Sequence, residues 1–474
     1  MDQLRFADEE FVMPISAAPL PVAPIPHHAL LLLLLQVGLL LLLALLLGRL
    51  AVRLRMPAIV GELCAGVLMG PSLLSTVIPG VADWLFPQEA AQMHLLDAVG
   101  QLGVLLLVGF TGVHLDLSLV RRHGARAAGV SAAGLLVPLA MGVGLGLLLP
   151  GVMRAEDADP LVFALFVGVA MSVSAIPVIA RTLMDMGLLH RTVGQLTLVV
   201  GTVDDAVGWL LLSIVAAMAT TGLDGGELAL TFGELGLVLL CVATVGRLVV
   251  RHALRAAARS EVRGLPIAVC VVLVMLSSAG THALGLEAVF GAFLCGILIG
   301  RSADEVGPPR LEPLNTTVLV VLAPLFFATA GLRMDLTALA DPVIALWALA
   351  VAGTAIGGKF IGAFVGALGA RMTRWEALAL GAGMNARGVI EVVIAMAGVR
   401  LGLLTTEMFS VVVLVAVLTS VMAPPLLRVA MNRVERTADE ELRERRAVAW
   451  HTPLAPRSGS GSGSGAGPSA SDFG

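Results

Sequence analysis

Residues 201–209 read Gly201-Thr-Val-Asp-Asp-Ala-Val-Gly-Trp209, and apolar residues flank this stretch on both sides. The whole region near 191–219 is long and apolar enough to predict a membrane-spanning helix. A carboxylate at the centre of a bilayer costs roughly 2.5–3.5 kcal/mol on insertion scales, so two adjacent aspartates need a reason to be there. Because intramembrane acids mark ion and proton pathways, Asp204 and Asp205 are the first candidate site residues.

The composition predicts a membrane protein with many spans rather than a globular enzyme with one anchor. Of the 474 residues, 58% are hydrophobic and 14% are charged, and the mean hydropathy is +0.95. A soluble domain carries about 25% charged residues. The four cysteines lie in apolar stretches without disulfide or zinc spacing, and no basic-aromatic cluster lies outside the spans. We therefore expect no cofactor and no nucleic-acid partner, and a lipid bilayer as the surroundings.

Hydropathy predicts about 13 membrane spans, each of about 20 residues. They lie near 29–49, 57–74, 95–115, 125–149, 160–184, 191–219, 227–249, 264–283, 286–300, 313–332, 343–369, 374–400 and 405–428. The predicted fold class is therefore an all-α polytopic membrane protein.

Arginine positions orient these spans. With the N-terminus outside, nearly all loop arginines fall on the inner side, and only Arg154, Arg333 and Arg400 fall outside. The positive-inside rule favours this topology in a cell membrane. It makes residues 1–28 an extracytoplasmic N-terminal segment and residues 431–474 a cytoplasmic tail. The Ser/Gly-rich composition from Ser458 onward predicts that this tail is flexible.

Six spans, a connector and six more spans give two halves of opposite topology, the inverted-repeat plan of many secondary transporters. This plan predicts broken helices at corresponding positions. The fifth span contains Ser172-Val-Ser-Ala-Ile-Pro177, in which proline interrupts helical hydrogen bonding. The fifth span of the second half contains Gly381-Ala-Gly-Met-Asn-Ala-Arg-Gly388, in which glycines weaken the helix. We expect these two broken helices to cross.

Further polar residues lie near the centres of the predicted spans. Lys359, the only lysine, follows Gly357-Gly358 in a segment where helix backbones can approach closely. Its ammonium group needs a partner, and a carboxylate from residues 204–205 is the expected one. Arg387 and Glu391 are four residues apart, so they share a helix face and can pair. Either ion pair could alternatively be purely structural.

At these residues the chain resembles the monovalent cation:proton antiporters of cation:proton antiporter family two. The matching pieces, in order, are Ser174–Arg181, Gly201–Asp205, Gly358–Gly362 and Met384–Glu391, and the resemblance covers roughly residues 30–430. It implies that Asp205 carries the ion, that Asp204 pairs with Lys359, and that this pattern is electrogenic. Ser174, Pro177, Asn385, Arg387 and Glu391 would support the broken helices.

The resemblance also implies a homodimer and a membrane antiporter domain at 29–430. In that domain, scaffold helices span about 29–115 and 264–332, and core helices span about 125–219 and 343–428. The expected function is secondary active exchange of protons for Na⁺ or K⁺ by alternating access, with the transported cation as the only metal bound. The alternative is a gated potassium efflux protein with channel-like conductance, although the chain has no tyrosine and no filter-like carbonyl motif. An intramembrane enzyme is not expected, since no His-Glu-x-x-His pattern is present.

Overall fold

The computed structural model describes residues 24–54, 56–87, 89–114, 117–188, 190–221, 225–262, 264–302, 310–437 and 440. This part of the chain is helical, and its one isolated β-bridge pairs Arg154 with Leu404. Most of the predicted N-terminal segment and tail, residues 1–23 and 441–474, lie outside the described residues.

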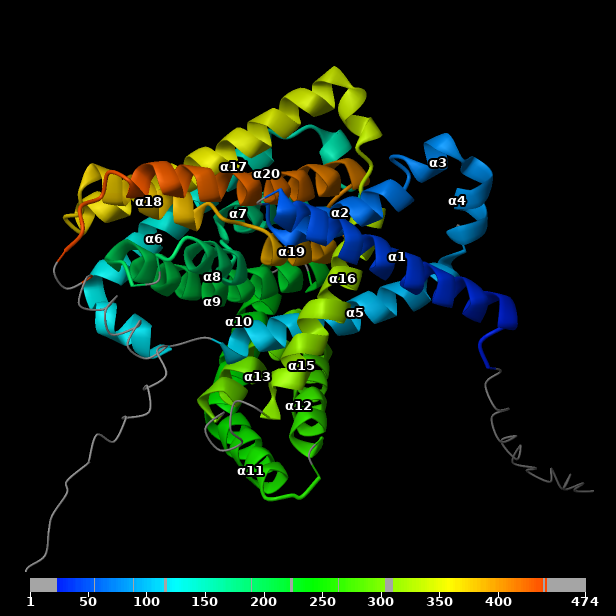
Figure 1. Cartoon of the computed structure of the whole chain (residues 1–474), viewed down its shortest axis with the longest axis horizontal. Coiled ribbons are helices and arrows are strands. Elements are labelled where there is room, and N and C mark those ends of the chain that lie inside the picture. Colours follow the sequence, from blue (N-terminus) through cyan, green and yellow to red (C-terminus); the bar gives the residue numbers. More distant parts are fainter. Residues whose placement is uncertain are drawn as a thin grey trace, which may run out of the picture.

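The helices follow the order expected from hydropathy (Figure 1). They are α1 (His27–Arg53), α2 (Ala58–Met69), α3 (Leu74–Val77), α4 (Pro79–Leu85), α5 (Ala90–Val113), α6 (Leu117–Leu148), α7 (Pro160–Ser172), α8 (Ile176–Asp185), α9 (Thr192–Thr221), α10 (Gly225–Cys241), α11 (Arg247–Ala258), α12 (Leu265–Ala283), α13 (Ala288–Arg301), α15 (Glu312–Thr317), α16 (Ala323–Leu332), α17 (Pro342–Gly369), α18 (Arg374–Met384), α19 (Val389–Arg400) and α20 (Thr406–Met431). Short π-helical segments, η2 (Val242–Gly246) and η4 (Val318–Leu322), join α10 to α11 and α15 to α16.

Among the described residues, ten helices are long and apolar enough to cross a membrane, and the bent pair α18–α19 makes an eleventh. The apolar helices α7 and α13 are shorter, and they lie in the predicted spans near 160–184 and 286–300. The all-α polytopic membrane fold is therefore confirmed. The total of 13 spans and the internal repeat stay predictions.

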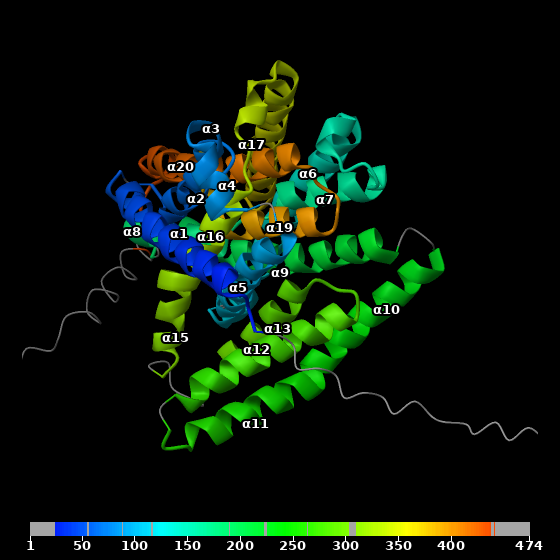
Figure 2. The same cartoon turned by 90° about the vertical axis from the view of Figure 1, so that its right-hand side faces the viewer.

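Most of the helices pack in two groups. The site group comprises α6–α9 and α17–α20, in which α6 packs against α7, α9 and α17, and α18 packs against α17 and α20. The flanking group comprises α1, α2, α5, α12, α13, α15 and α16, in which α2 packs against α1 and α16, and α13 packs against α5 and α12. Contacts between the groups include those of α13 with α9 and of α16 with α19. Figure 2 shows α11 and α12 extending away from the rest of the molecule.

Glycine allows the closest helix crossings of the flanking group. A Cβ added at Gly296 of α13 would lie 1.9 Å from the Gly109 carbonyl oxygen of α5. A Cβ at Gly66 of α2 would lie 2.0 Å from the Ala328 carbonyl oxygen of α16. Since neither backbone could keep its place against a side chain, these helices pack directly through their backbones, as small residues permit between membrane helices.

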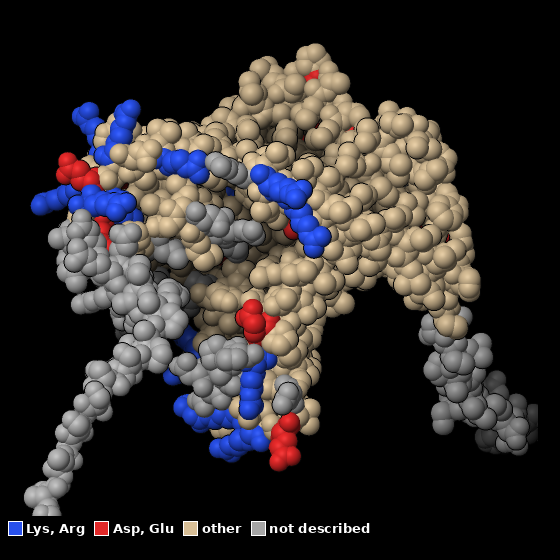
Figure 3. Space-filling model, viewed as in Figure 1, with Lys and Arg blue, Asp and Glu red and all other residues tan. Residues whose placement is uncertain are grey.

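Charged side chains are unevenly distributed over the surface. On the face drawn in Figure 3, Lys and Arg side chains gather toward the end where α18 begins and around α11. A further group lies near the middle of this face, and the right-hand part of the face is almost free of them. Exposed leucines such as Leu34 and Leu42 of α1 are common on this apolar surface. A broad apolar surface with basic side chains confined to part of the molecule fits a protein that faces lipid.

The described residues that follow α20 dock back onto the start of α9. The Glu440 carboxylate accepts hydrogen bonds from the backbone N–H of Thr192 (2.7 Å) and Thr437 (3.1 Å), and lies 3.0 Å from Arg191 Nε. Arg191 also donates to the carbonyl oxygens of Val434 and Glu435. The first part of the predicted flexible tail is therefore tied to the helix that carries the two aspartates.

One ion pair joins the two groups at the far end of α19. The Arg400 guanidinium contacts Glu287, which precedes α13, and Gln101 of α5. Nearby, Arg333 and Asp97 form a second ion pair within the flanking group. These side chains are part of the surface in this region, because the Arg400 side chain is 36% exposed.

Candidate functional site

The two predicted helix breaks are present and meet each other. α7 ends at Ser172 and α8 starts at Ile176, while α18 ends at Met384 and α19 starts at Val389 after a 48° bend. The backbone N–H of Ala175 in the first break donates to the Ala386 carbonyl oxygen in the second, at 3.1 Å. A hydrogen bond between the two extended segments therefore joins the two broken helices at their crossing.

Local sequence accounts for both breaks. Pro177 lies in the first turn of α8, where a missing N–H costs no helical hydrogen bond; its side chain lies outside the described part of the structure. Gly388 has φ of +152°, a conformation that other residues rarely adopt. A Cβ at Gly388 would also lie 2.9 Å from Val178 Cγ2 of α8. Pro177 and Gly388 thus allow the chain to begin α8 and α19 next to the crossing.

The predicted ion pair between Asp204 and Lys359 is present. Lys359 Nζ lies 2.7 Å from Asp204 Oδ2, and both side chains are fully buried. Lys359 also donates to the Gly134 carbonyl oxygen at 3.2 Å, and Ser131 Oγ lies 3.3 Å from Asp204 Oδ1. The pair therefore links α9 to α17 and α6, and hydrogen bonds from α6 help to satisfy its buried charges.

Ser174 connects Asp204 to the helix crossing. Its Oγ lies 2.8 Å from the Met384 carbonyl oxygen and 3.1 Å from Asp204 Oδ2. A hydroxyl group has one proton, so it donates to only one of these acceptors at a time. Asp204 is thus held by groups from α6, α17 and the first break.

Arg387 caps the broken helix α7 from the second break. Its guanidinium donates to the carbonyl oxygens of Ala170 (3.2 Å) and Met171 (2.6 Å) at the end of α7, and to that of Ala355 (2.8 Å) in α17. It also makes the predicted ion pair with Glu391, at 3.1 Å. The last carbonyl groups of a helix lack intrahelical partners, so a buried cation there compensates for the break.

Asp205 differs sharply from Asp204. It is fully buried, yet neither carboxylate oxygen has a hydrogen-bond partner among the described residues. Its electrostatic neighbours are Asp204, Lys359 and the backbone N–H of Ile176 at the start of α8. The buried amide of Asn385 in the second break also lacks partners within the described part of the chain. Asp205 is therefore the buried acid of this site that lacks a side-chain partner among the described residues.

The described residues contain no group of three or more His, Cys, Asp or Glu side chains that could hold a metal ion. The site is instead built from one paired aspartate, one unpaired aspartate and two helix breaks. Such an arrangement suits the reversible binding of a single small cation or a proton, because among the described residues of the site Asp205 is a buried carboxylate without an ion-pair partner.

Residues of α6 are the part of the site that sequence reasoning missed. Ser131 and the Gly134 carbonyl contact the ion pair, although the predicted span near 125–149 contributed no candidate residue. A serine within an apolar span was the only available signal, and such residues are common. Trp209 lies in the stretch 201–209 that first marked the site, but the residues that surround its ring could not be inferred from sequence spacing.

Comparison with known proteins agrees with this geometry. A family model described as "Sodium/hydrogen exchanger, transmembrane" matches residues 38–433. The chain is 31% identical over 390 residues to the Na(+)/H(+) antiporter NhaS4 of Synechocystis, covering 81% of this chain and 93% of that protein. It is 30% identical over 404 residues to Cation/H(+) antiporter 20 of Arabidopsis thaliana, covering 82% of this chain and 47% of that protein. The chain thus spans about half the length of the plant relatives it matches.

A solved structure supports the same fold. The sodium proton antiporter MjNhaP1 from Methanocaldococcus jannaschii superposes with a TM-score of 0.64 at 15% sequence identity. The match covers 85% of this chain and 99% of that one. The arrangement of helices is therefore similar although few residues are shared.

Proposed function

Since this chain belongs to the sodium/hydrogen exchanger family, we propose that it exchanges protons for a monovalent cation, Na⁺ or K⁺, across a membrane. The observation that carries the proposal is the unpaired, fully buried carboxylate of Asp205 beside the crossing of two broken helices. A buried ionisable residue of this kind marks an ion or proton pathway. The chain itself therefore supplies one site at which a proton and a cation would compete.

In this proposal the two aspartates have different roles. Asp205 binds either a proton or the cation, because its oxygens have no competing partner among the described residues. Asp204 stays paired with Lys359. When a cation enters beside both carboxylates, it weakens the attraction between Asp204 and Lys359, and Lys359 can then release its own proton. This second proton would make the exchange electrogenic.

The packing supports alternating access by movement of one helix group. The site group, α6–α9 and α17–α20, would be the moving core, and the flanking group would be the fixed scaffold and the surface for a homodimer. The backbone hydrogen bond between Ala175 and Ala386, with the Arg387 contacts to α7 and α17, would keep the core rigid as it moves. We place the N-terminus outside and the arginine-rich end of α18 in the cytoplasm.

Reconstitution into proteoliposomes with an imposed pH gradient tests the proposal. Wild-type protein should dissipate the gradient when Na⁺ or K⁺ is added, and Asp205→Asn should abolish this response. The matched control is Asp97→Asn, since Asp97 belongs to the ion pair with Arg333 in the flanking group. Wild-type exchange by Asp205→Asn would contradict the assignment. Cation conductance that is independent of the proton gradient would instead indicate the channel-like alternative.

A further inference from the structure

Asp205 shares one face of α9 with two other buried residues, Trp209 and Ser213. Asp205, Trp209 and Ser213 follow each other at intervals of four residues, which places them in one stripe along the helix. All three are fully or almost fully buried. Each has a buried polar atom without a hydrogen-bond partner among the described residues: the two carboxylate oxygens of Asp205, Nε1 of Trp209 and Oγ of Ser213.

Three other hydroxyl groups of α9 behave differently. Thr197, Thr202 and Thr220 each donate to the carbonyl oxygen four residues earlier in the helix. This local hydrogen bond is the usual arrangement for a hydroxyl within an apolar helix. Ser213 makes no such bond in the described structure. A buried indole N–H also usually finds an acceptor. The stripe therefore concentrates unused hydrogen-bonding capacity on the face that bears Asp205.

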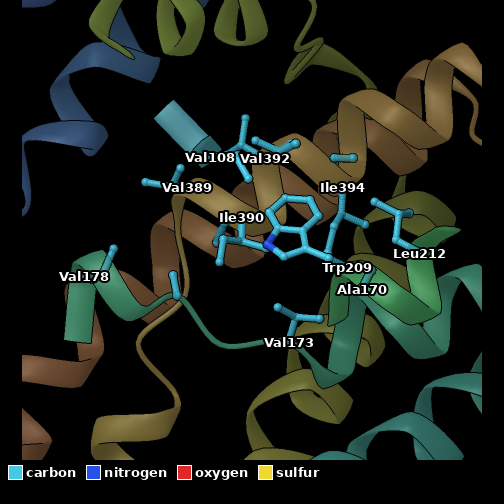
Figure 4. Packing of buried hydrophobic residues seen from close by; sticks show 14 of the residues in the cluster. Val108, Ala170, Val173, Val178, Trp209, Leu212, Val389, Ile390, Val392 and Ile394 are labelled. Carbon is cyan, nitrogen blue, oxygen red and sulfur yellow. The ribbon is translucent and has the colours of Figure 1, made fainter. Parts of the chain in front are cut away.

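Trp209 fills the space between the two helix groups. Its ring lies 6.2 Å from that of Phe293 of α13, measured between centroids, at an interplanar angle of 45°. Figure 4 shows Val108 of α5, Val173 of the first break and Ile390 of α19 around the same indole. Within the site group, α9 packs closely against the first break beside this tryptophan, because a Cβ at Gly208 would lie 2.6 Å from Val173 Cγ2. Residues of both groups thus form an apolar collar around Trp209: Phe293 and Val108 from the flanking group, and Val173 and Ile390 from the site group.

We propose that Asp205, Trp209 and Ser213 line the passage between the ion site and the Thr221 end of α9, and that Trp209 is its gate. The inference rests on the proposed exchange function. Apolar constrictions close a pore by excluding water, and the collar around Trp209 is such a constriction one helical turn from Asp205. When the site group moves, Trp209 separates from Phe293. Water then enters and accepts a hydrogen bond from the indole N–H and bonds to the Ser213 hydroxyl, and the ion moves through this water toward the end of α9.

A purely structural Trp209 would be equally buried, so the test must measure how tightly cation movement is coupled to proton movement, and not only the rate of exchange. In proteoliposomes, Trp209→Ala should raise the cation leak measured without a pH gradient by about tenfold, because it shifts the balance between closed and open gate. Phe293→Ala should give a leak of the same kind. Trp209→Phe should restore tight coupling, because a large ring again fills the collar. Trp347→Ala, in the half-buried part of α17, is the matched control and should not leak.

A thiol-labelling experiment tests the passage itself. Ser213→Cys is made in a background in which the four native cysteines are replaced by serine. A membrane-impermeant thiol reagent should modify this cysteine from the side at which α9 ends, and not from the other side. Absence of modification from both sides would overturn the passage, and so would equal modification from both.

The outcomes separate the gate from the proposed function. If Asp205→Asn is inactive while Trp209→Ala and Phe293→Ala keep the wild-type ratio of protons to cations, the exchange function stands and the gate is wrong. A slower but fully coupled Trp209→Ala would likewise overturn the gate, since it would show that the indole only packs. If Asp205→Asn exchanges normally, the ion site itself is wrong, whatever the tryptophan variants do.

Discussion

The buried pair of Asp204 and Lys359 makes a quantitative prediction about stability. Both side chains are fully buried and 2.7 Å apart, so removing one partner leaves the other charge buried without compensation. Breaking a buried pair in this way costs about 3–5 kcal/mol, whereas replacing both partners with neutral residues of similar volume can be nearly neutral. Asp204→Asn and Lys359→Met should each destabilise the protein strongly, and the double variant should recover most of that loss.

The structure also predicts which single variant is worse. Without Lys359, the Asp204 carboxylate still has the hydroxyl groups of Ser131 and Ser174 within hydrogen-bond distance. With an amide in place of the Asp204 carboxylate, the Lys359 ammonium retains only carbonyl oxygens as acceptors among its described partners, that of the amide and that of Gly134. Asp204→Asn should therefore cost more than Lys359→Met, because a carboxylate within reach of two hydroxyl groups is better compensated than an ammonium that has only carbonyl oxygens.

Denaturation of the four proteins in one detergent, followed by circular dichroism, measures this cycle. Because the two single losses sum to about 6–10 kcal/mol and the double variant should lose little, we expect a coupling energy of at least about 5 kcal/mol between the two positions. The half-exposed pair of Arg333 and Asp97 is the control, and its coupling should not exceed about 1 kcal/mol. A double variant whose loss equals the sum of the two single losses would refute the reasoning.

Three other predictions concern regions outside the ion site. Burial alone would raise the pKa of Glu440, but backbone hydrogen bonds and the neighbouring arginine hold this pKa below its ordinary value of 4.5. The contact of Glu440 with α9 should therefore stabilise the protein above pH 4.5, and this stabilisation should be lost as the pH falls through the lowered pKa. Glu440→Gln should reduce the resulting drop in melting temperature at acid pH. Gly296→Ala should cost at least about 1–3 kcal/mol because its Cβ would meet backbone, whereas Gly353→Ala, with nothing within 4 Å, should fold normally by size-exclusion chromatography. Arg400→Gln should change the apparent KM for the cation measurably, by up to about fivefold, since partly exposed ion pairs contribute about 1 kcal/mol or less. An unchanged KM would show that this pair does not bias the two helix groups.

Sequence reasoning succeeded where a residue type is costly in its surroundings. A single lysine and two adjacent aspartates in apolar spans require compensation, so their pairing could be predicted, and the structure shows Lys359 with Asp204. Proline and clustered glycine disfavour regular helix, so both breaks could be placed before their geometry was known. In each of these cases the physical cost is a property of the residue and its near neighbours along the chain.

Contacts between distant segments that involve ordinary residues could not be predicted in this way. Ser131 is a common small residue, and only the packing of α6 against α9 brings it to Asp204. The composition beyond α20 predicts a flexible tail, yet Glu440 binds the first backbone N–H of α9, a residue far away in sequence. The direction in which Trp209 points depends on how α9 lies against α13. Such information is carried by the packing of whole helices and not by a local pattern.

The hydrogen bonds at the crossing limit how this protein could tell one cation from another. The carbonyl oxygens of Ala170 and Met171 already accept from Arg387, and that of Met384 lies 2.8 Å from the Ser174 hydroxyl. Ion filters built from carbonyl rings replace the hydration shell with backbone oxygens, which links selectivity to ionic radius or dipole strength. At this crossing those oxygens are already engaged. The choice between sodium and potassium would thus depend on side chains near Asp205 and on how many water molecules the ion retains, so single side-chain substitutions should be able to change it.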